Sequence, residues 1–341
     1  MKKRIVSLLL ALVMVFALCA CGSSQQTTAT DTNAADTSAP AADAAPAEEV
    51  NYPTKEITLV VPFAAGGGND LVARLFAEYA KKYCDQPFVI VNQGGGGGVP
   101  ATAEYLAKPA DGYTVIYAAS APTCTQAILS DIPYDITTDI DFLCETNEDP
   151  LCIVVAKDCP ANNMDEFVTW ATENELTFGA NNGGVHYFAA LAMMNDLGIR
   201  ANYVPTEGGA DSLAKLLGGH VDYVTVHPNE VLSSYTSGET KIISVMADER
   251  LDILPDAPTC IEQGYNYSYS VLKGFIARPG MDAGVREKLV EICKNVLTDE
   301  EFIAKCADIG SYIEYKSGED YKSKNVSDFE TFSAAFAAVN G

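Results

Sequence analysis

Basic residues are scarce in this 341-residue sequence, in which 22 Lys and Arg stand against 46 Asp and Glu for a formal net charge of -24 at pH 7. No basic run follows Lys2, Lys3 and Arg4, and binding to nucleic acid or to an anionic membrane surface requires clustered Lys and Arg. Nucleic acid is therefore excluded as a partner. Long apolar runs are also missing beyond the amino terminus, so we predict a globular chain of one to three domains.

Histidine is rarer still, since the chain contains only His186, His220 and His227. They do not form the HExxH pattern of a zinc enzyme, and the sequence has neither a GxSxG elbow nor a CxxC pair. We therefore predict no metal, no cofactor and no catalytic residue. His220, in the segment GGHVDY, is expected to be structural.

The amino terminus has the pattern of an export signal. Three cations precede the apolar stretch Ile5 to Ala20, which is too short to span a bilayer stably. The following Cys21 stands in LCACG, a segment that resembles the bacterial lipobox, although an ordinary signal peptide with cysteines by chance is the alternative. We expect a signal peptide over 1–20, a lipidated Cys21 and a disordered polar tether over 21–50. The chain would then be extracytoplasmic and anchored to the outer face of the cell membrane.

Eight further cysteines lie in the body of the chain: Cys84, Cys124, Cys144, Cys152, Cys159, Cys260, Cys293 and Cys306. Several have apolar neighbours, which favours small buried thiols. Export also permits disulfides, so their redox state stays open.

Short β-branched runs alternate with amphipathic helical patterns after the tether. The predicted strands are Ile57 to Phe63, Phe88 to Val91, Tyr113 to Tyr117, Leu151 to Ala156, Leu176 to Ala180, Asn202 to Pro205, Val221 to Val226 and Lys241 to Met246. One helix is predicted over Leu71 to Cys84, and another starts at Asn163, where Glu166 three positions later is typical of a capping box. This alternation predicts parallel sheets covered by helices on both faces.

Two strand ends lead into glycine-rich loops. VVPFAAGGGND places Gly66, Gly67 and Gly68 before a helix, and VNQGGGGG places five glycines after the next strand. Glycines adopt the backbone conformations that let N–H groups converge, and a helix amino terminus adds a partial charge of roughly +0.5, so an anion site without a formal cation is predicted. Neither loop completes a dinucleotide or P-loop motif, and simple tight turns are the alternative.

Seven segments in order resemble the substrate-binding proteins of tripartite tricarboxylate transporters, the Bug and TctC-like receptors. They are YPTKEITLVVPFAAGGGNDLVARLFAE, VIVNQGGGGG, DGYTVIYAASA, IPYD, LLGGHVDYV, LPDAPTCIEQGY and GFIARPGM, spread from Tyr52 to Met281. The resemblance implies an α/β, two-domain, periplasmic-binding-protein-like type II fold with parallel-rich sheets and two crossover strands. Domain one would be 51–150 plus 272–341, domain two would be 151–271, and Leu151 to Ala156 and Val271 to Ala277 would be the crossovers.

The same resemblance implies a function and partners. Such a receptor captures a small organic acid in an interdomain cleft and delivers it to a large and a small membrane subunit, and a monomer is expected. It is not an enzyme, although an exported enzyme or a ligand-sensing receptor domain on the same fold are alternatives.

Carried over by position, the resemblance implies two groups of ligand-binding residues. In domain one they are Phe63, Ala64, Ala65, Gly66, Gly67, Gly68, Asn69, Asp70, Gly96, Gly97, Ser120 and Ala121. In domain two they are Asn181, Gly183, Gly184, His186, Thr206, Glu207, Gly208 and His227.

Three of these residues have open alternatives. Asp70 contacts a ligand water or caps a helix, and His186 contacts ligand or starts a helix. Glu207, where the family often has a basic or neutral residue, either repels a second carboxylate or points to solvent. Lys273 also departs from the family, which usually has an aromatic residue there.

Overall fold

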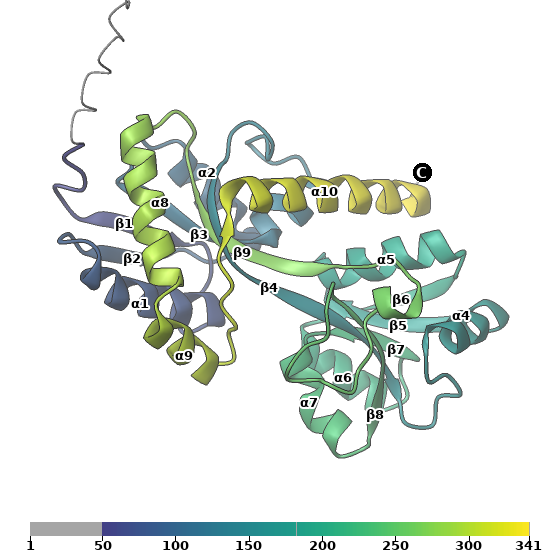
Figure 1. The fold of residues 1–341 in the computed structure, drawn as a ribbon. Coiled ribbons are helices and arrows are strands. Elements are labelled where there is room, and N and C mark those ends of the chain that lie inside the picture. Colours follow the sequence, from purple (N-terminus) through teal and green to yellow (C-terminus); the bar gives the residue numbers. More distant parts are fainter. Residues whose placement is uncertain (1–49, 182, 341) are drawn as a thin grey trace, which may run out of the picture. The chain divides into compact units, whose positions relative to one another are not determined.

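The computed structural model describes residues 50–181 and 183–340 (Figure 1). The signal peptide, Cys21 and nearly all of the tether lie outside the described residues. The strands are β1 (Ile57–Val61), β2 (Phe88–Asn92), β3 (Thr114–Ala119), β4 (Asp141–Ala156), β5 (Leu176–Asn181), β6 (Ala201–Thr206), β7 (Tyr223–Val226), β8 (Thr240–Met246), β9 (Ser270–Ala277) and β10 (Lys316–Ser317). The helices are α1 (Gly68–Tyr79), α2 (Val99–Leu106), α3 (Gln126–Leu129), α4 (Met164–Glu173), α5 (Val185–Leu197), α6 (Gly209–Leu217), α7 (Pro228–Thr236), α8 (Ala283–Leu297), α9 (Glu300–Asp308) and α10 (Gly318–Asn340).

Two sub-sheets share the long strand β4. The first sub-sheet has the order β2-β1-β3-β9-β4 with β10 beside β4, and the second has the order β4-β7-β5-β6 with β8 beside β4. Strand β1 runs parallel to β2 and β3, and β5 runs parallel to β6 and β7. Strand β4 runs antiparallel to β9 in the first sub-sheet and to β7 and β8 in the second, so each sub-sheet mixes both directions.

Successive residues of a strand point to opposite faces of its sub-sheet, and both faces are buried. In the first, Leu59 and Val61 pack with residues of α1, α8 and α9, whereas Val60 on the other face packs with residues of α2 and α10. In the second, Ile153 packs with α4 and α5, whereas Val154 packs with α6 and α7. Both faces are therefore covered by helices, as the alternation of strands and helices predicted.

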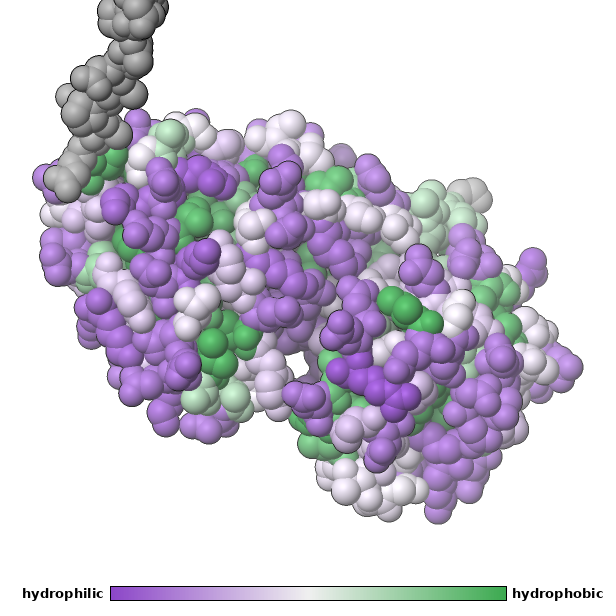
Figure 2. Space-filling model, in the orientation of Figure 1, coloured by the Kyte–Doolittle hydropathy of each residue, from purple (hydrophilic) through white to green (hydrophobic). Residues whose placement is uncertain are grey.

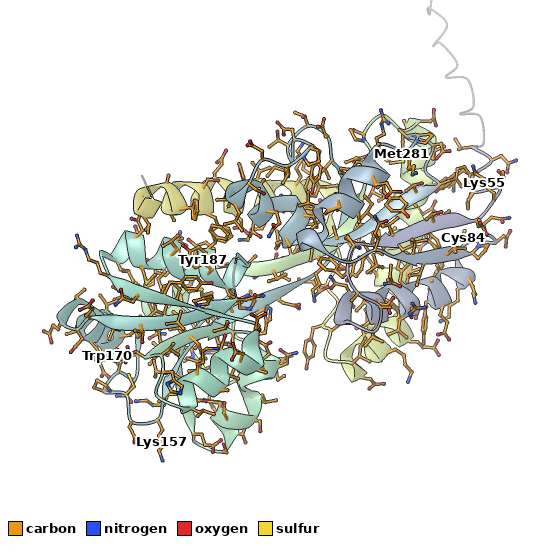
Figure 3. All side chains as sticks on the ribbon, turned by 180° about the vertical axis from the view of Figure 1, so that it is seen from behind. Lys55, Cys84, Lys157, Trp170, Tyr187 and Met281 are labelled. Carbon is orange, nitrogen blue, oxygen red and sulfur yellow. The ribbon has the colours of Figure 1, made fainter. Side chains whose placement is uncertain are left out.

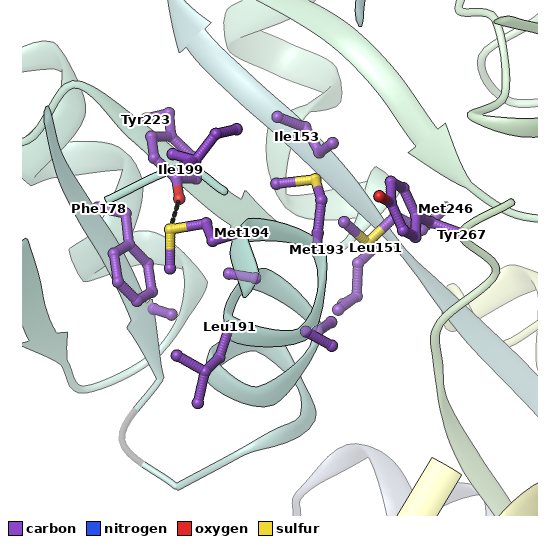
Figure 4. Close-up of a cluster of buried hydrophobic side chains, with 14 of the residues drawn as sticks. Leu151, Ile153, Phe178, Leu191, Met193, Met194, Ile199, Tyr223, Met246 and Tyr267 are labelled. Atoms are coloured by element: carbon purple, nitrogen blue, oxygen red, sulfur yellow. Dashed lines mark hydrogen bonds between the residues drawn. The ribbon is translucent and has the colours of Figure 1, made fainter. Parts of the chain in front are cut away.

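The core between α5 and the second sub-sheet is rich in methionine and aromatic side chains (Figure 4). The Tyr223 hydroxyl donates to the sulfur of Met194 at 2.7 Å. The chain's single tryptophan, Trp170 of α4, is partly buried and packs against the same core (Figure 3). Seven of the eight described cysteines are buried, Cys159 is partly exposed, and all eight are free thiols.

The predicted strands all overlap observed ones, but β4 is longer than predicted. It begins at Asp141 rather than Leu151, and its first part pairs with β9 from Asp141–Ala277 to Pro150–Ser270. The acidic residues in this part hid the strand from a search for apolar runs. Leu151 to Ala156 is therefore the second half of one continuous strand, paired with β7 and β8.

Helix α10 contacts both sub-sheets. Its first turns pack on β4, where the Tyr321 ring lies 4.8 Å from the Phe142 ring. Farther along, the Phe332 ring lies 5.8 Å from the Phe188 ring of α5. The carboxyl-terminal helix thus joins the two sub-sheets in addition to β4 and β9.

The visible surface is mostly hydrophilic with small separate hydrophobic areas (Figure 2). Within residues 50–340, apart from the masked position 182, no helix has both the length and the apolar character needed to cross a membrane.

Candidate functional site

The two glycine-rich loops meet at the carboxyl ends of β1 and β2. A Cβ at Gly94 would lie 3.0 Å from the Ala64 nitrogen, so the second loop touches the first through its backbone. A Cβ at Gly98 would lie 3.2 Å from Pro62 and 3.3 Å from Pro122, which follows β3. Three neighbouring strand ends therefore converge, which is the place where α/β sheets bind ligands.

Asp70 holds the first loop from inside. This carboxylate is 1% exposed and accepts hydrogen bonds from Gly66 N (2.7 Å), Arg74 Nε (2.9 Å) and Asn92 Nδ2 (2.9 Å). Burial raises its pKa, but the hydrogen bonds from Arg74, Gly66 and Asn92 outweigh burial and hold the pKa below its usual range. The residue preceding α1 is Gly67, so Asp70 lies inside the first turn and ties the loop to β2.

The second loop contains a run of left-handed backbone. Gly95, Gly96, Gly97 and Gly98 have φ of +112°, +55°, +62° and +83°, values that side chains other than glycine rarely adopt. Successive N–H groups in such a run form an anion-binding concavity. The first turn of α2 and the turn before it have no acidic residue and no side-chain cap, so no carboxylate of this helix start competes for those N–H groups.

Residues after β3 are placed differently from one another. Ser120 is buried, and its hydroxyl accepts from Leu272 N at 2.9 Å, so its oxygen joins β3 to β9. Ala121 begins a π-helical turn over Ala121–Thr125 and is partly exposed. In the next turn, the Gln126 side chain lies against Gly97, where a Cβ would be 2.6 Å from the amide carbon.

The loop after β5 lies near this same turn. A Cβ at Gly183 would lie 2.5 Å from Leu129 Cδ1 and 4.0 Å from Gln126 Nε2. Gln126 is thus close to a predicted binding loop of each sub-sheet. Sequence analysis missed it because an isolated Gln has no motif, and only the fold brings it between Gly97 and Gly183.

His186 and His227 come together at the second sub-sheet. Their ring centroids lie 4.6 Å apart, and burial, followed by the charge of His227, lowers the pKa of His186 to about 3. His186 is the second residue of α5 and is 8% exposed, so it lies at a helix start and is neutral at physiological pH. Tyr187, labelled in Figure 3, is the next residue of this helix. Its ring stacks on Phe178 of β5 with centroids 6.2 Å apart.

His227 also contacts the shared strand. Its Nδ1 lies 3.1 Å from the backbone oxygen of Pro150 in β4, and its backbone N–H donates to the Glu230 carboxylate at 2.8 Å. His227 is therefore the residue that precedes α7 and caps it together with Glu230.

The start of α6 has its polar groups occupied by the protein itself. The buried Thr206 hydroxyl lies 2.7 Å from the Ser212 hydroxyl, and Glu207 N donates to Asp211. The Glu207 side chain is exposed. Gly208 has φ of +146°, a conformation open to glycine.

The predicted residues thus form two groups, one at each sub-sheet. Seven of the predicted residues are exposed: Ala64, Ala65, Gly66, Gly67, Gly68, Gly96 and Gly97. Four others are partly buried: Phe63, Asn69, Asn181 and Gly184. Sequence analysis missed Asn92 and Arg74, which fix Asp70, and Glu230, which lies at two helix starts. The contact of Asn92 with Asp70 depends on how β2 lies beside β1, which the sequence does not give.

A hollow of about 420 Å³ lies elsewhere, between α5, residues 266–269 and α10. Its polar groups include Tyr267, whose hydroxyl donates to Asp196 at 2.6 Å. Among the described residues no group of His, Cys, Asp or Glu is arranged to hold a metal ion.

Two linked α/β sub-sheets with glycine loops at their strand ends define the class of periplasmic-binding-protein-like folds. A crystal structure of a TctC solute binding protein from Polaromonas, without ligand, matches 84% of this chain and 99% of its own at 27% identity and a TM-score of 0.78. Two further structures from Rhodopseudomonas palustris, MatC with bound malate and a protein with adipate, are 24% identical with TM-scores of 0.65 and 0.66. The match to MatC covers 83% of this chain and 99% of MatC, and the match to the adipate-bound protein covers 84% of this chain and 97% of that protein.

The sequence comparisons identify the family. The model of the tripartite tricarboxylate transporter family receptor matches residues 72–328. A protein of the TAR-I ttuE-ttuC' intergenic region of Agrobacterium vitis is 29% identical over 265 residues, which are 76% of this chain and 77% of the relative. This chain therefore belongs to the tripartite tricarboxylate transporter receptor family, which confirms the resemblance and the fold predicted from the sequence.

Proposed function

We propose that this protein is an extracytoplasmic receptor that captures a small organic carboxylate between its two domains and delivers it to the membrane subunits of a tripartite transporter. The observation that carries the proposal is the convergence of the Gly66 loop and the Gly95–Gly98 run at adjacent strand ends. Backbone N–H groups of such loops bind a carboxylate without a formal cation. Arg74, the nearby cation, is already paired with Asp70.

Family and neighbours support this reading. The family is one of transporter receptors, and malate and adipate, the ligands of two proteins with the same fold, are both carboxylates. We propose 51–150 plus 272–341 and 151–271 as the two domains, with the predicted residues of each as the two sides of the site. A receptor that senses the same ligand would share this site, and pull-down of its membrane partners separates the two functions.

Replacement of Gly66 by Val tests the carboxylate site. A Cβ at Gly66 meets nothing within 4 Å, so a larger side chain would fill the open space beside the loop where we propose that the carboxylate binds. We expect carboxylate binding in a thermal-shift screen to be lost, whereas wild-type protein at 100 times the dissociation constant gains about 2.7 kcal/mol of stability.

Gly264→Val is the matched control, because Gly264 also has positive φ (+87° against +83°) and open space around its Cβ. Both variants pay the same backbone strain, so equal binding by the two would refute the site. A product assay on the bound acid tests the alternative of an exported enzyme.

We also propose that Cys21 carries a lipid anchor. Fatty-acid labelling of the expressed protein should be lost in Cys21→Ala. Unchanged labelling would show that the lipobox-like segment is not the modified site.

A further inference from the structure

The starts of α6 and α7 share one acidic side chain, Glu230. Its carboxylate lies directly against the backbone of Gly209, the first residue of α6, because a Cβ at position 209 would overlap it. The same carboxylate accepts from His227 N at 2.8 Å and so caps α7. One negative charge of the protein thus occupies the positive ends of two helices.

These helix starts lie at one edge of the second sub-sheet, the edge where α/β sheets bind ligands. Strands β5, β6 and β7 are parallel, so α5, α6 and α7 all begin at their carboxyl ends. The Glu230 carboxylate is joined to this edge through His227, whose ring packs on His186.

In the part of the chain that the structure describes, no Lys or Arg forms an ion pair with Glu230, and its basic neighbour is His227. The neighbouring acids are Glu207, which is exposed, and Asp211, which is paired with Lys215. His186 stays neutral at physiological pH because burial lowers its pKa to about 3. A second carboxylate on the ligand would therefore meet a like charge where a helix start would otherwise attract it.

We propose that Glu230 makes this receptor select organic acids with a single carboxylate, whose other end is neutral or carries an amine. The first sub-sheet would bind the carboxylate at its glycine loops, and the second would read the far end. This inference rests on the proposed function and names the class of ligand. The acid that distinguishes between ligands would then be Glu230, which stands in no sequence motif, rather than Glu207.

The test uses probes of equal length that differ only at the far end. Calorimetry would compare butyrate, succinate and 4-aminobutyrate, and likewise hexanoate, adipate and 6-aminohexanoate, on the wild-type protein. We expect the dicarboxylate of the series that fits to bind at least ten-fold more weakly than its partners. A dicarboxylate that binds as tightly as the matching monocarboxylate would overturn the inference.

Glu230→Gln keeps an oxygen that caps α7 but removes the charge. We expect the preference against the dicarboxylate to fall at least five-fold in this variant. Glu239→Gln is the control, since it removes an exposed acid just beyond the carboxyl end of the same helix. An unchanged preference in Glu230→Gln, or an equal change in Glu239→Gln, would reject the role of Glu230.

The wild-type comparison needs no variant, so it decides the matter even if Glu230→Gln fails to fold. Tight binding of a dicarboxylate rejects only the selectivity and leaves the carboxylate function intact. Binding of none of the six compounds would refute the proposed function together with this inference.

Discussion

Single residues in this protein differ sharply in how the fold treats their charge. Asp70 is buried with three hydrogen-bond donors, whereas Glu145 of β4 is buried with no hydrogen-bond partner among the described residues for either oxygen. Burial, followed by the charge of Glu148, raises the pKa of Glu145 to about 8. Lys316 lies 3.8 Å away but is also paired with Glu148. A carboxyl in these surroundings is favoured in its neutral form.

Glu145 therefore predicts a loss of stability as pH rises. Its folded pKa is about 8 against a reference of 4.5, so below pH 4.5 both states are protonated. Between pH 4.5 and 8 the unfolded chain ionises first, and folding free energy is lost progressively. Glu145→Gln should remove this dependence and raise the free energy of unfolding at pH 8 by roughly 4 kcal/mol, because each pKa unit between the two states corresponds to about 1.4 kcal/mol.

Urea denaturation at pH 5 and pH 8 measures this effect. Glu249→Gln, at an exposed position, is the control and should leave the pH dependence as in the wild type. A wild-type stability that does not fall between the two pH values would contradict the buried neutral carboxyl.

At the scale of elements, the packing of β4 against β9 depends on close backbone contact. A Cβ at Gly274 of β9 would lie 2.5 Å from the Cys144 oxygen of β4 and 2.5 Å from the Tyr321 ring of α10. Three elements thus meet where only glycine leaves enough space. Strands β4 and β9 and helix α10 are therefore held close together at Gly274.

Gly274→Ala should therefore destabilise the protein. Overpacking of a tight site costs about 1–3 kcal/mol, and backbone atoms cannot move aside as a flexible side chain can. The midpoint of chemical denaturation measures the loss. Gly68→Ala, where a Cβ meets nothing within 4 Å, is the control, and equal stability of the two variants would show that the β4–β9 contact can relax.

At the scale of the whole molecule, three connections join the sub-sheets: β4, β9 and α10. Strand β4 passes from its pairing with β9 directly into its pairing with β8, so a rotation of one sub-sheet would bend this strand, whereas α10 must keep or shift its contact with α5. Ligand capture by closure therefore predicts a small rigid-body rotation with α10 as a third support.

Small-angle scattering with and without a saturating carboxylate tests the closure. We expect the radius of gyration to fall on binding, because both groups of predicted residues would contact one ligand. Gly66→Val, which should not bind, gives the unliganded value under the same conditions. Identical scattering of the wild type in both states would refute closure.

Local patterns determined much of this protein. Apolar alternation located every predicted strand, since burial on both faces requires β-branched residues, and glycine runs located the loops of the first sub-sheet because positive φ requires glycine. The sequence could not reveal that Asn92 and Arg74 hold Asp70, or that Gln126 lies between two loops. Nor could it reveal that the Thr206 hydroxyl bonds Ser212 and that the Ser120 hydroxyl bonds Leu272 N. These contacts join residues of different elements.

Charge shows the same division most clearly. The excess of acids, 46 against 22 basic residues, follows from the sequence alone and excludes polyanionic partners. Which of those acids lie at the strand ends was decided by tertiary structure, which exposes Glu207 to solvent and places Glu230 against the starts of α6 and α7. The physical reason is range: net charge acts through screened solvent over about 8 Å, whereas a carboxylate acts on a ligand only where the fold puts it.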